Sequence, residues 1–178
     1  RIDAVTRKIG TDYDGEKRRL DSLSAALLYK IDRDLLTSIS FESARDDAEQ
    51  DYQGTPLVNG KLDKRVRDIN YNNLADGVDA GDSLWLKHRI EWRPARNVEL
   101  NNQLYYQKAS ADVRRLYLAV QDAANPGLVN RRGYDASQQQ SLLGNRLDLI
   151  VRGDVAGLRN RALVGLDLSR MELNREQS

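Results

Sequence analysis

Residues 22–43 read SLSAALLYKIDRDLLTSISFES, and the architecture of the chain follows from the pattern of this stretch. Apolar residues alternate with small or polar residues on both sides of a charged turn at 32–34. Alternation with a period of two is typical of β-strands whose two faces meet different surroundings. The stretch therefore predicts two antiparallel strands joined by a tight turn, with Leu23 and Ile39 on an apolar face and the serines on a polar face.

The same pattern recurs twice further along the sequence. Pairs of alternating runs occupy 84–107 and 143–168, and a partial strand over 1–8 precedes the first pair. Three tight turns are evenly spaced along the chain, near Arg33, Ala95 and Gly157. Repetition of one structural unit at a fixed spacing indicates a repeated hairpin architecture. We therefore expect an all-β fold, an antiparallel meander of about seven strands.

The hairpins are joined by long polar connections, over 46–82 and roughly 110–137, although Leu116, Leu118 and Val120 predict strand extensions inside the second. Loops of this length are uncommon in a compact soluble domain. In bacterial outer-membrane barrels, turns are short on the periplasmic side and loops are long on the extracellular side. The unequal connections therefore favour part of a large transmembrane β-barrel over a soluble sheet.

A membrane barrel also explains why so little of the chain is apolar. Hydrophobic residues make up 40% of the 178 residues, and acyl chains would cover the apolar face in place of a second protein layer. No apolar run is long enough for a membrane helix. A soluble all-β interaction module with one buried face explains the alternation equally well, but it gives no account of the unequal connections.

Composition excludes several kinds of site. The 28 basic and 27 acidic residues nearly balance and form no basic block, so charge does not indicate a nucleic-acid partner. The absence of cysteine excludes disulfides, thiolate metal sites and a cysteine nucleophile, and a single histidine excludes a histidine-rich metal site. That histidine, His88, falls with Asn102 on the apolar face of neighbouring strands. We expect the two to pair with each other or to lie near an interface.

Four segments resemble the TonB-dependent siderophore receptors of the Gram-negative outer membrane, and the resemblance extends over nearly the whole chain. They are YQGTPLVNGKLD (52–63), LKHRIEWRPARNVELNNQLYY (86–106), QQQSLLGNRLDLIVRG (138–153) and LRNRALVGLDLSR (158–170). Each resembles an element from the middle portion of the family's barrel. The family often has a histidine before the last of these strands, where this chain has Asn160 and Arg161, and the departure concerns only a turn.

The resemblance implies a barrel of roughly 22 strands, filled by an N-terminal plug domain. It implies that a ferric siderophore is captured at the external face and imported with energy from the TonB complex, which contacts the plug. Residues 1–178 would be one segment of the barrel domain, with the plug and the remaining strands outside it. The expected partners are the siderophore, the TonB complex, and outer-membrane lipid and lipopolysaccharide, with no nucleic acid.

Capture of an iron atom that is already chelated requires no protein ligand to the metal, so we expect neither a metal site nor a cofactor. It requires aromatic surface and charge-complementary donors near the outer ends of strands. The candidate ligand-binding residues are Trp85, Tyr105, Arg114, Arg115, Tyr117, Tyr52 and Tyr71. Each aromatic residue has an alternative structural interpretation, in an interfacial girdle or in loop packing. The girdle is preferred for the aromatic residues of the apolar face, Tyr29, Phe41, Trp92 and Tyr106.

Other charged residues are expected to have structural functions. The carboxylates of 76–82 lack the ligand alternation of a calcium loop, and Asp46 and Asp47 point to opposite faces of a strand. Charge ladders between neighbouring strands, or with a plug, are expected from Lys87, Arg89, Glu91, Arg146, Asp148 and Arg152. No nucleophile-elbow motif is present, so the sequence predicts no catalytic residue and no enzyme.

The residues leave other functions open. A receptor for haem, cobalamin or a saccharide would share this hairpin plan. An outer-membrane lipase or protease of the barrel type is a further alternative, and it would depend on His88. A soluble interaction module would differ from all of these in needing no detergent for extraction.

Overall fold

The computed structural model describes residues 1–10, 17–49, 57–58, 61–62, 64–66, 69, 77–122, 124–125 and 128–177. The long strands are β1 (Ile2–Gly10), β2 (Lys17–Lys30), β3 (Leu35–Glu49), β6 (Val78–Ala95), β7 (Val98–Gln121), β8 (Val129–Val155) and β9 (Leu158–Gln177). The short elements are β4 (Leu57–Val58), β5 (Lys61–Leu62) and the 3₁₀ helix η1 (Lys64–Val66).

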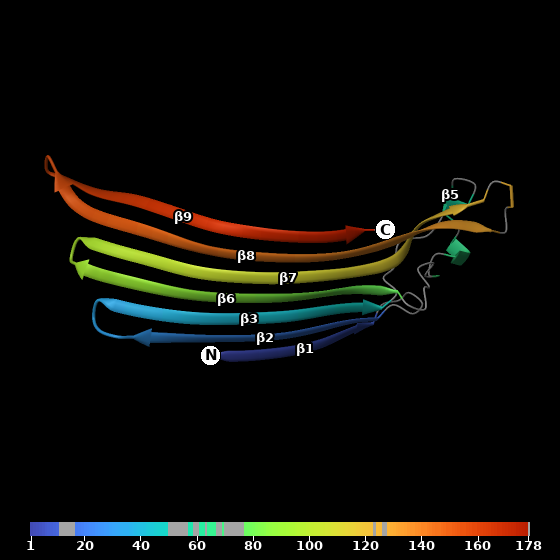
Figure 1. The fold of residues 1–178 in the computed structure, drawn as a ribbon, viewed down its shortest axis with the longest axis horizontal. Coiled ribbons are helices and arrows are strands. Elements are labelled where there is room, and N and C mark those ends of the chain that lie inside the picture. The colour runs from blue at the N-terminus through green and yellow to red at the C-terminus, as the bar shows by residue number, and fades with distance from the viewer. Residues whose placement is uncertain are drawn as a thin grey trace.

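The long strands form one antiparallel sheet in which each strand pairs with its neighbours along the chain, in the order β1-β2-β3-β6-β7-β8-β9. Figure 1 shows this sheet as a single curved layer, with β1 at one edge and β9 at the other. The strands β4 and β5 form a separate two-stranded ribbon. The structure therefore confirms the predicted seven-stranded antiparallel meander.

The strands β7 and β8 are longer than the alternating pattern predicts, and Figure 1 shows them running past the ends of their neighbours. They remain paired as far as Gln121 opposite Val129, so most of the connection expected over 110–137 is β-structure. The predicted extension through Leu116, Leu118 and Val120 is confirmed, since β7 ends at Gln121, whereas the matching extension of β8 from Val129 was not predicted. Charged residues occupy both faces of this ribbon, so its strands lack the alternation of apolar and polar residues on which the prediction depended.

The turn between β7 and β8 is organised by Asp122. Its Oδ1 accepts hydrogen bonds from the backbone N–H groups of Asn125 (2.9 Å) and Ala124 (2.8 Å), and its Oδ2 accepts one from Asn130 Nδ2 (3.2 Å). The bonds from the Asn125 and Ala124 amides favour the ionised carboxylate and lower the pKa of Asp122 from its usual value. The far end of the long ribbon is thus closed by local hydrogen bonds.

The register places the predicted apolar positions of the strands on one face of the sheet, which we call the apolar face. Leu86 of β6 pairs with Phe41 of β3 on one side and with Tyr106 of β7 on the other, and Tyr106 pairs with Leu143 of β8. Successive residues of a strand point to opposite faces, so the intervening residues form a polar face. The aromatic residues predicted to share the apolar face, Tyr29, Phe41, Trp92 and Tyr106, do so.

No protein layer covers the apolar face within the described ranges. Leu27, Leu104 and Val164 on this face are 63%, 46% and 69% exposed. Among the same residues, only Ala136 and Ile150 are buried hydrophobic residues. No helix in this part of the chain has the length and apolarity needed to span a membrane. The sheet therefore has no core of its own, and its apolar face depends on some other covering.

The two conspicuous polar residues of the apolar face do not pair with each other, so the first of the two alternatives was wrong, while a position near an interface stays a prediction. His88 Nε2 lies 2.9 Å from Thr37 Oγ1 on β3. Asn102 donates to Asn145 Oδ1 on β8 at 2.9 Å, and Asn145 Nδ2 donates back to Asn102 Oδ1 at 3.3 Å. His88 on β6 bonds to β3, and Asn102 on β7 bonds to β8, because each of these neighbouring strands has a polar residue on the same face. The polar side chains are thus satisfied within the sheet.

The charged residues of the polar face form ion pairs along strands and also between them, as Arg18 does with Asp46 and Arg115 with Asp79. We expected ladders between strands or with a plug. Arg89 contacts Glu91 at 3.1 Å and Arg146 contacts Asp148 at 3.0 Å, each two residues apart in one strand. Of the residues expected to form ladders, Arg152 makes the ion pair that crosses to a neighbour, Glu99, at 2.8 Å. Residues two apart share a face of a strand and lie within reach of a long side chain, which favours the pairs along a strand.

A two-residue turn joins β8 to β9. Val155 and Leu158 pair across it, and the central residues Ala156 and Gly157 have φ angles of 52° and 79°. Positive φ at both central positions is characteristic of a type I′ turn, whose twist matches that of the flanking strands. Gly157 adopts this conformation without strain, whereas the side chain of Ala156 opposes it.

Candidate ligand-binding surface

The predicted residue Trp85 lies on the polar face of β6, near the middle of the sheet. It pairs with Glu42 of β3 and Gln107 of β7, and the ammonium of Lys87 lies 5.0 Å from the centroid of its ring. Such a cation–π contact contributes about 0.5–1 kcal/mol at an exposed position. A hollow of about 310 Å³ lies beside this pair, over small residues of β2 and β3 that include Ser24 and Ser40. This hollow is lined by charges of both signs.

Tyr105 is also on the polar face, but it has a structural function there. Its hydroxyl donates to Asp167 Oδ1 of β9 at 2.9 Å, although β8 lies between β7 and β9. The ring reaches across β8 at Gly144, where an added Cβ would lie 2.2 Å from Tyr105 Cζ. Gly144 therefore provides the space through which Tyr105 connects the two strands.

The structure separates the two predicted arginines of β7. Arg114 contacts Asp135 at 2.8 Å and continues the register of the apolar face. Arg115 contacts Asp79 at 3.0 Å and shares the polar face with Trp85 and Tyr105. Consecutive strand residues point to opposite faces, so Arg114 and Arg115 cannot contribute to one site.

The remaining predicted residues are only partly placed. The backbone of Tyr117 belongs to β7 and pairs with Arg132 of β8, while its side chain lies outside the described part of the structure. Tyr52 and Tyr71 lie outside the described residues. Their contribution to ligand binding stays a prediction.

The sequence did not single out a group of residues on the polar face where β7 and β8 run past their neighbours. Tyr134 of β8 pairs with Arg115 of β7, and Arg132 lies two residues before Tyr134 on the same face. Arg175 of β9 donates from Nη2 to the Tyr134 hydroxyl at 3.1 Å. We call these four residues the Tyr134 cluster: Arg115, Arg132, Tyr134 and Arg175. Residues 129–141 lack apolar alternation, so this segment was assigned to a polar connection.

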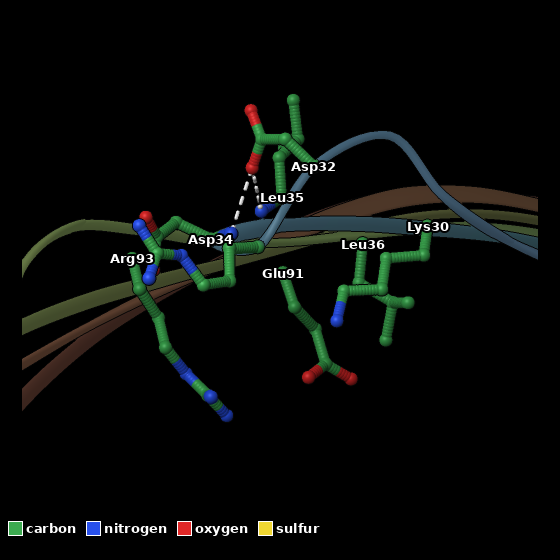
Figure 2. A pocket seen from close by; sticks show the side chains of 8 residues that line it. Lys30, Asp32, Asp34, Leu35, Leu36, Glu91 and Arg93 are labelled. Atoms are coloured by element: carbon green, nitrogen blue, oxygen red, sulfur yellow. Dashed lines mark hydrogen bonds between the residues drawn. The ribbon is translucent and has the colours of Figure 1, made fainter.

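A second hollow lies at the opposite end of the sheet, beside the turn between β2 and β3. Its volume is about 190 Å³, and Figure 2 shows the side chains of Lys30, Glu91 and Arg93 around it. Asp32 Oδ1 accepts hydrogen bonds from the backbone N–H groups of Asp34 (2.7 Å) and Leu35 (2.8 Å), drawn as dashed lines in Figure 2. Mixed charge and a fixed turn favour a structural function for this end.

The acidic residues do not converge. Asp46 contacts the Arg18 side chain at 2.7 Å, whereas Asp47 lies 3.8 Å from Arg45, so the two neighbouring carboxylates belong to different faces as predicted. In the described ranges, no group of three or more histidine, aspartate or glutamate side chains is placed to hold a metal ion.

No family model and no curated protein matches the sequence. Solved structures do match the fold. BauA, the ferric preacinetobactin receptor from Acinetobacter baumannii, matches 99% of this chain with a TM-score of 0.82 and 6% sequence identity. FpvAI, in its complex with pyocin S2, matches 99% with a TM-score of 0.86 and 10% identity. FpvA from P. aeruginosa, bound to a heterologous pyoverdine with iron, matches 98% with a TM-score of 0.84 and 11% identity.

The chain spans about a quarter of the length of these structures, since it covers 26%, 23% and 24% of them. Identities this low show the fold alone. That fold is nevertheless shared over almost the whole chain. The chain therefore has the fold of a seven-stranded stretch of the barrel wall of siderophore receptors from the outer membrane, which is the fold that its sequence predicts.

Proposed function

We propose that the chain is a segment of the barrel domain of an outer-membrane receptor that binds a ferric siderophore and imports it with energy from the TonB complex. The observation that carries this proposal is the seven-stranded sheet with an uncovered apolar face, which matches ferric siderophore receptors over 98–99% of its length. In this function iron arrives as part of the ligand, so the chain needs no cofactor.

The two faces of the sheet support a place in the outer membrane. A lipid bilayer offers no hydrogen bonds, so a spanning sheet must pair its backbone groups between strands and satisfy its polar side chains internally. On the apolar face, His88 is bonded to Thr37 and Asn102 to Asn145. Exposed leucine and valine side chains fill the positions between them. Acyl chains would cover this face, and lipopolysaccharide would meet its outer rim.

Binding without catalysis is the activity that the polar face supports. The hydroxyl of Tyr105 and the carboxylates of Glu91 and Asp148 are engaged in contacts within the sheet. His88 lies on the opposite face, bonded to Thr37, where it could not serve a hydrolytic site on the polar face. Charged and aromatic groups remain to contact a ligand at the end of the sheet where β7 and β8 run past their neighbours, which we call the long-strand end. We propose TonB as a partner of the complete receptor through a plug domain.

The test is a deletion of the gene followed by growth under iron limitation. Ferric siderophores of several chemical classes, haem, cobalamin and a saccharide are each supplied as the test nutrient, and uptake of the labelled ligand is measured. We expect the deletion to abolish growth on one ferric siderophore and to leave growth on the other nutrients unchanged. Loss of haem, cobalamin or saccharide uptake instead would identify a receptor for a different ligand. Extraction from cells without detergent would contradict the membrane location.

A further inference from the structure

We infer that the Tyr134 cluster binds an anionic oxygen-donor group, and that the ligand of this receptor is therefore a negatively charged chelate. The inference rests on the proposed function and adds the chemical class of the ligand. The cluster lies on the polar face, at the end of the sheet where β7 and β8 run past their neighbours, and β7, β8 and β9 each contribute residues to it.

The cluster is held together by strand pairing and by one side-chain hydrogen bond. Arg115 and Tyr134 are directly opposite in the β7–β8 register, and Arg132 shares the face of Tyr134 two residues away. Arg175 comes from β9 and donates to the Tyr134 hydroxyl at 3.1 Å and to Gln177 Oε1 at 3.1 Å. Three neighbouring strands thus contribute arginines to the surroundings of Tyr134, and Arg175 contacts its hydroxyl.

The charges of this cluster are not balanced within the described residues. Arg115 has a carboxylate partner, Asp79, at 3.0 Å. Neither Arg132 nor Arg175 forms an ion pair within the described residues, although Arg175 donates to neutral oxygens. Arg89 and Arg146 on the same face do have carboxylate partners, Glu91 and Asp148. The other polar-face arginines without an ion pair in the described residues lie on the edge strand β1 or near the short turns: Arg7, Arg93, Arg159 and Arg161. Arg132 and Arg175 are the ones that lie at the end where β7 and β8 run past their neighbours.

Two arginines that form no ion pair within the described residues favour an anion beside Tyr134. Guanidinium groups bind carboxylate, phosphate and aryl-oxide oxygens through short charge-assisted hydrogen bonds, and Arg132 and Arg175 are both exposed to solvent. The positive potential would also attract an anionic ligand over longer distances at low salt. An uncharged chelate would gain neither effect. The hollow beside Trp85 lacks this preference, because Glu42 and Lys87 both line it.

The test measures binding of two ferric complexes to the complete receptor in detergent, one an anionic tris-catecholate and the other an uncharged tris-hydroxamate. The variants are Arg132→Gln, Arg175→Gln and the double variant. Arg170→Gln is the matched control, because Arg170 lies on the same strand as Arg175 but on the other face, paired with Glu172 at 2.7 Å. Heat-modifiable migration in gels verifies that each variant has folded.

We expect the anionic complex to bind more tightly and the affinity to fall about tenfold for each arginine that is replaced, because hydrogen bonds to charged groups are stronger than those between neutral groups. The dependence of binding on salt should weaken in the double variant and stay unchanged in Arg170→Gln. Equal binding of both complexes, or an unaltered affinity in the double variant, would overturn the inference and leave the proposed function intact. Failure of every ferric siderophore to bind would contradict both this inference and the proposed function.

Discussion

The apolar and polar faces of the sheet are made by the same strands, yet they solve different physical problems. On the apolar face, Leu104 and Val164 are exposed without a protein layer, and the polar side chains satisfy one another in pairs such as Asn102 with Asn145. On the polar face, charged residues alternate along strands and one aromatic residue, Tyr105, crosses a neighbouring strand. One face is suited to surroundings without hydrogen bonds, and the other to water and ions.

The strongest test of this difference is a charge placed on each face. Leu104→Arg puts a guanidinium on the apolar face, and Gln103→Arg puts one on the polar face of the same strand. In a bilayer we expect Leu104→Arg to reduce the free energy of unfolding by about 2–4 kcal/mol. Gln103→Arg faces Arg89 and Arg146 on the neighbouring strands, so it should lower the free energy of unfolding by a smaller amount, about 0.2–1 kcal/mol. Urea unfolding of the complete receptor in lipid vesicles measures both.

The same pair of variants distinguishes a membrane sheet from a soluble one in which the apolar face stays exposed to water. An exposed leucine in water tolerates replacement by arginine, because the new charge remains solvated. Equal stability of Leu104→Arg and Gln103→Arg would therefore contradict the assignment of the apolar face to lipid. Amounts of each variant in the outer membrane provide a second measurement in cells.

The paired amides of the apolar face provide the next test. Asn102→Leu removes one partner and leaves the Asn145 amide without its hydrogen bonds, which we expect to cost about 1–3 kcal/mol of unfolding free energy. Asn102→Leu with Asn145→Leu removes both polar groups, and most of the stability should return. The unfolding free energies of the single and double variants, measured in vesicles, give the coupling directly. A double variant less stable than the single one would show that the amides have another partner.

A smaller effect is expected on the polar face, at Gly144. The Cβ of Gly144→Ala would displace the ring of Tyr105, because it would lie 2.2 Å from Tyr105 Cζ, and the hydrogen bond to Asp167 would be lost. We expect a lower midpoint of urea unfolding for Gly144→Ala in the natural chain. In a Tyr105→Ala background, the same substitution should have no effect. A Gly144→Ala variant that is equally destabilised in both backgrounds would show that the space is needed for something other than Tyr105.

The division into two faces could be predicted from the sequence because it depends on a local pattern. Alternation in 22–43 and 84–107 determines which residues share a face, and the register of the sheet preserves it across the strands. The contacts between side chains could not be predicted in the same way. His88 bonds to Thr37, 51 positions away in sequence, and that choice depends on the three-dimensional register of neighbouring strands.

The candidate site was predicted less completely than the fold. Trp85, Tyr105 and Arg115 lie on the polar face, but Tyr105 is engaged with Asp167 and Arg114 lies on the opposite face. The Tyr134 cluster was missed because its residues come from three strands and its segment of β8 lacks apolar alternation. Binding surfaces of this kind are assembled from polar residues, which give little periodic signal.

The separation of the faces also depends on the turns, because a slip of one residue in strand register moves every side chain to the opposite face. The turn at Ala156 and Gly157 fixes the register of β8 and β9. A left-handed conformation costs an ordinary residue about 1–2 kcal/mol, and asparagine tolerates it better than alanine does. We expect Ala156→Asn, which creates the favoured Asn-Gly pair, to raise the unfolding free energy by up to about 1 kcal/mol.

Gly157→Ala is the matched control for that prediction, since it introduces a side chain at a φ of 79° in the same turn. It should lower the unfolding free energy by about as much as Ala156→Asn raises it. Neither side chain contacts a face of the sheet, so neither substitution should alter ligand binding or the response to Leu104→Arg. A stabilised Gly157→Ala variant would mean that the cross-strand pairs of the two faces fix the β8–β9 register. The turn would then adopt its conformation because the strands are already paired, and it would not determine their register.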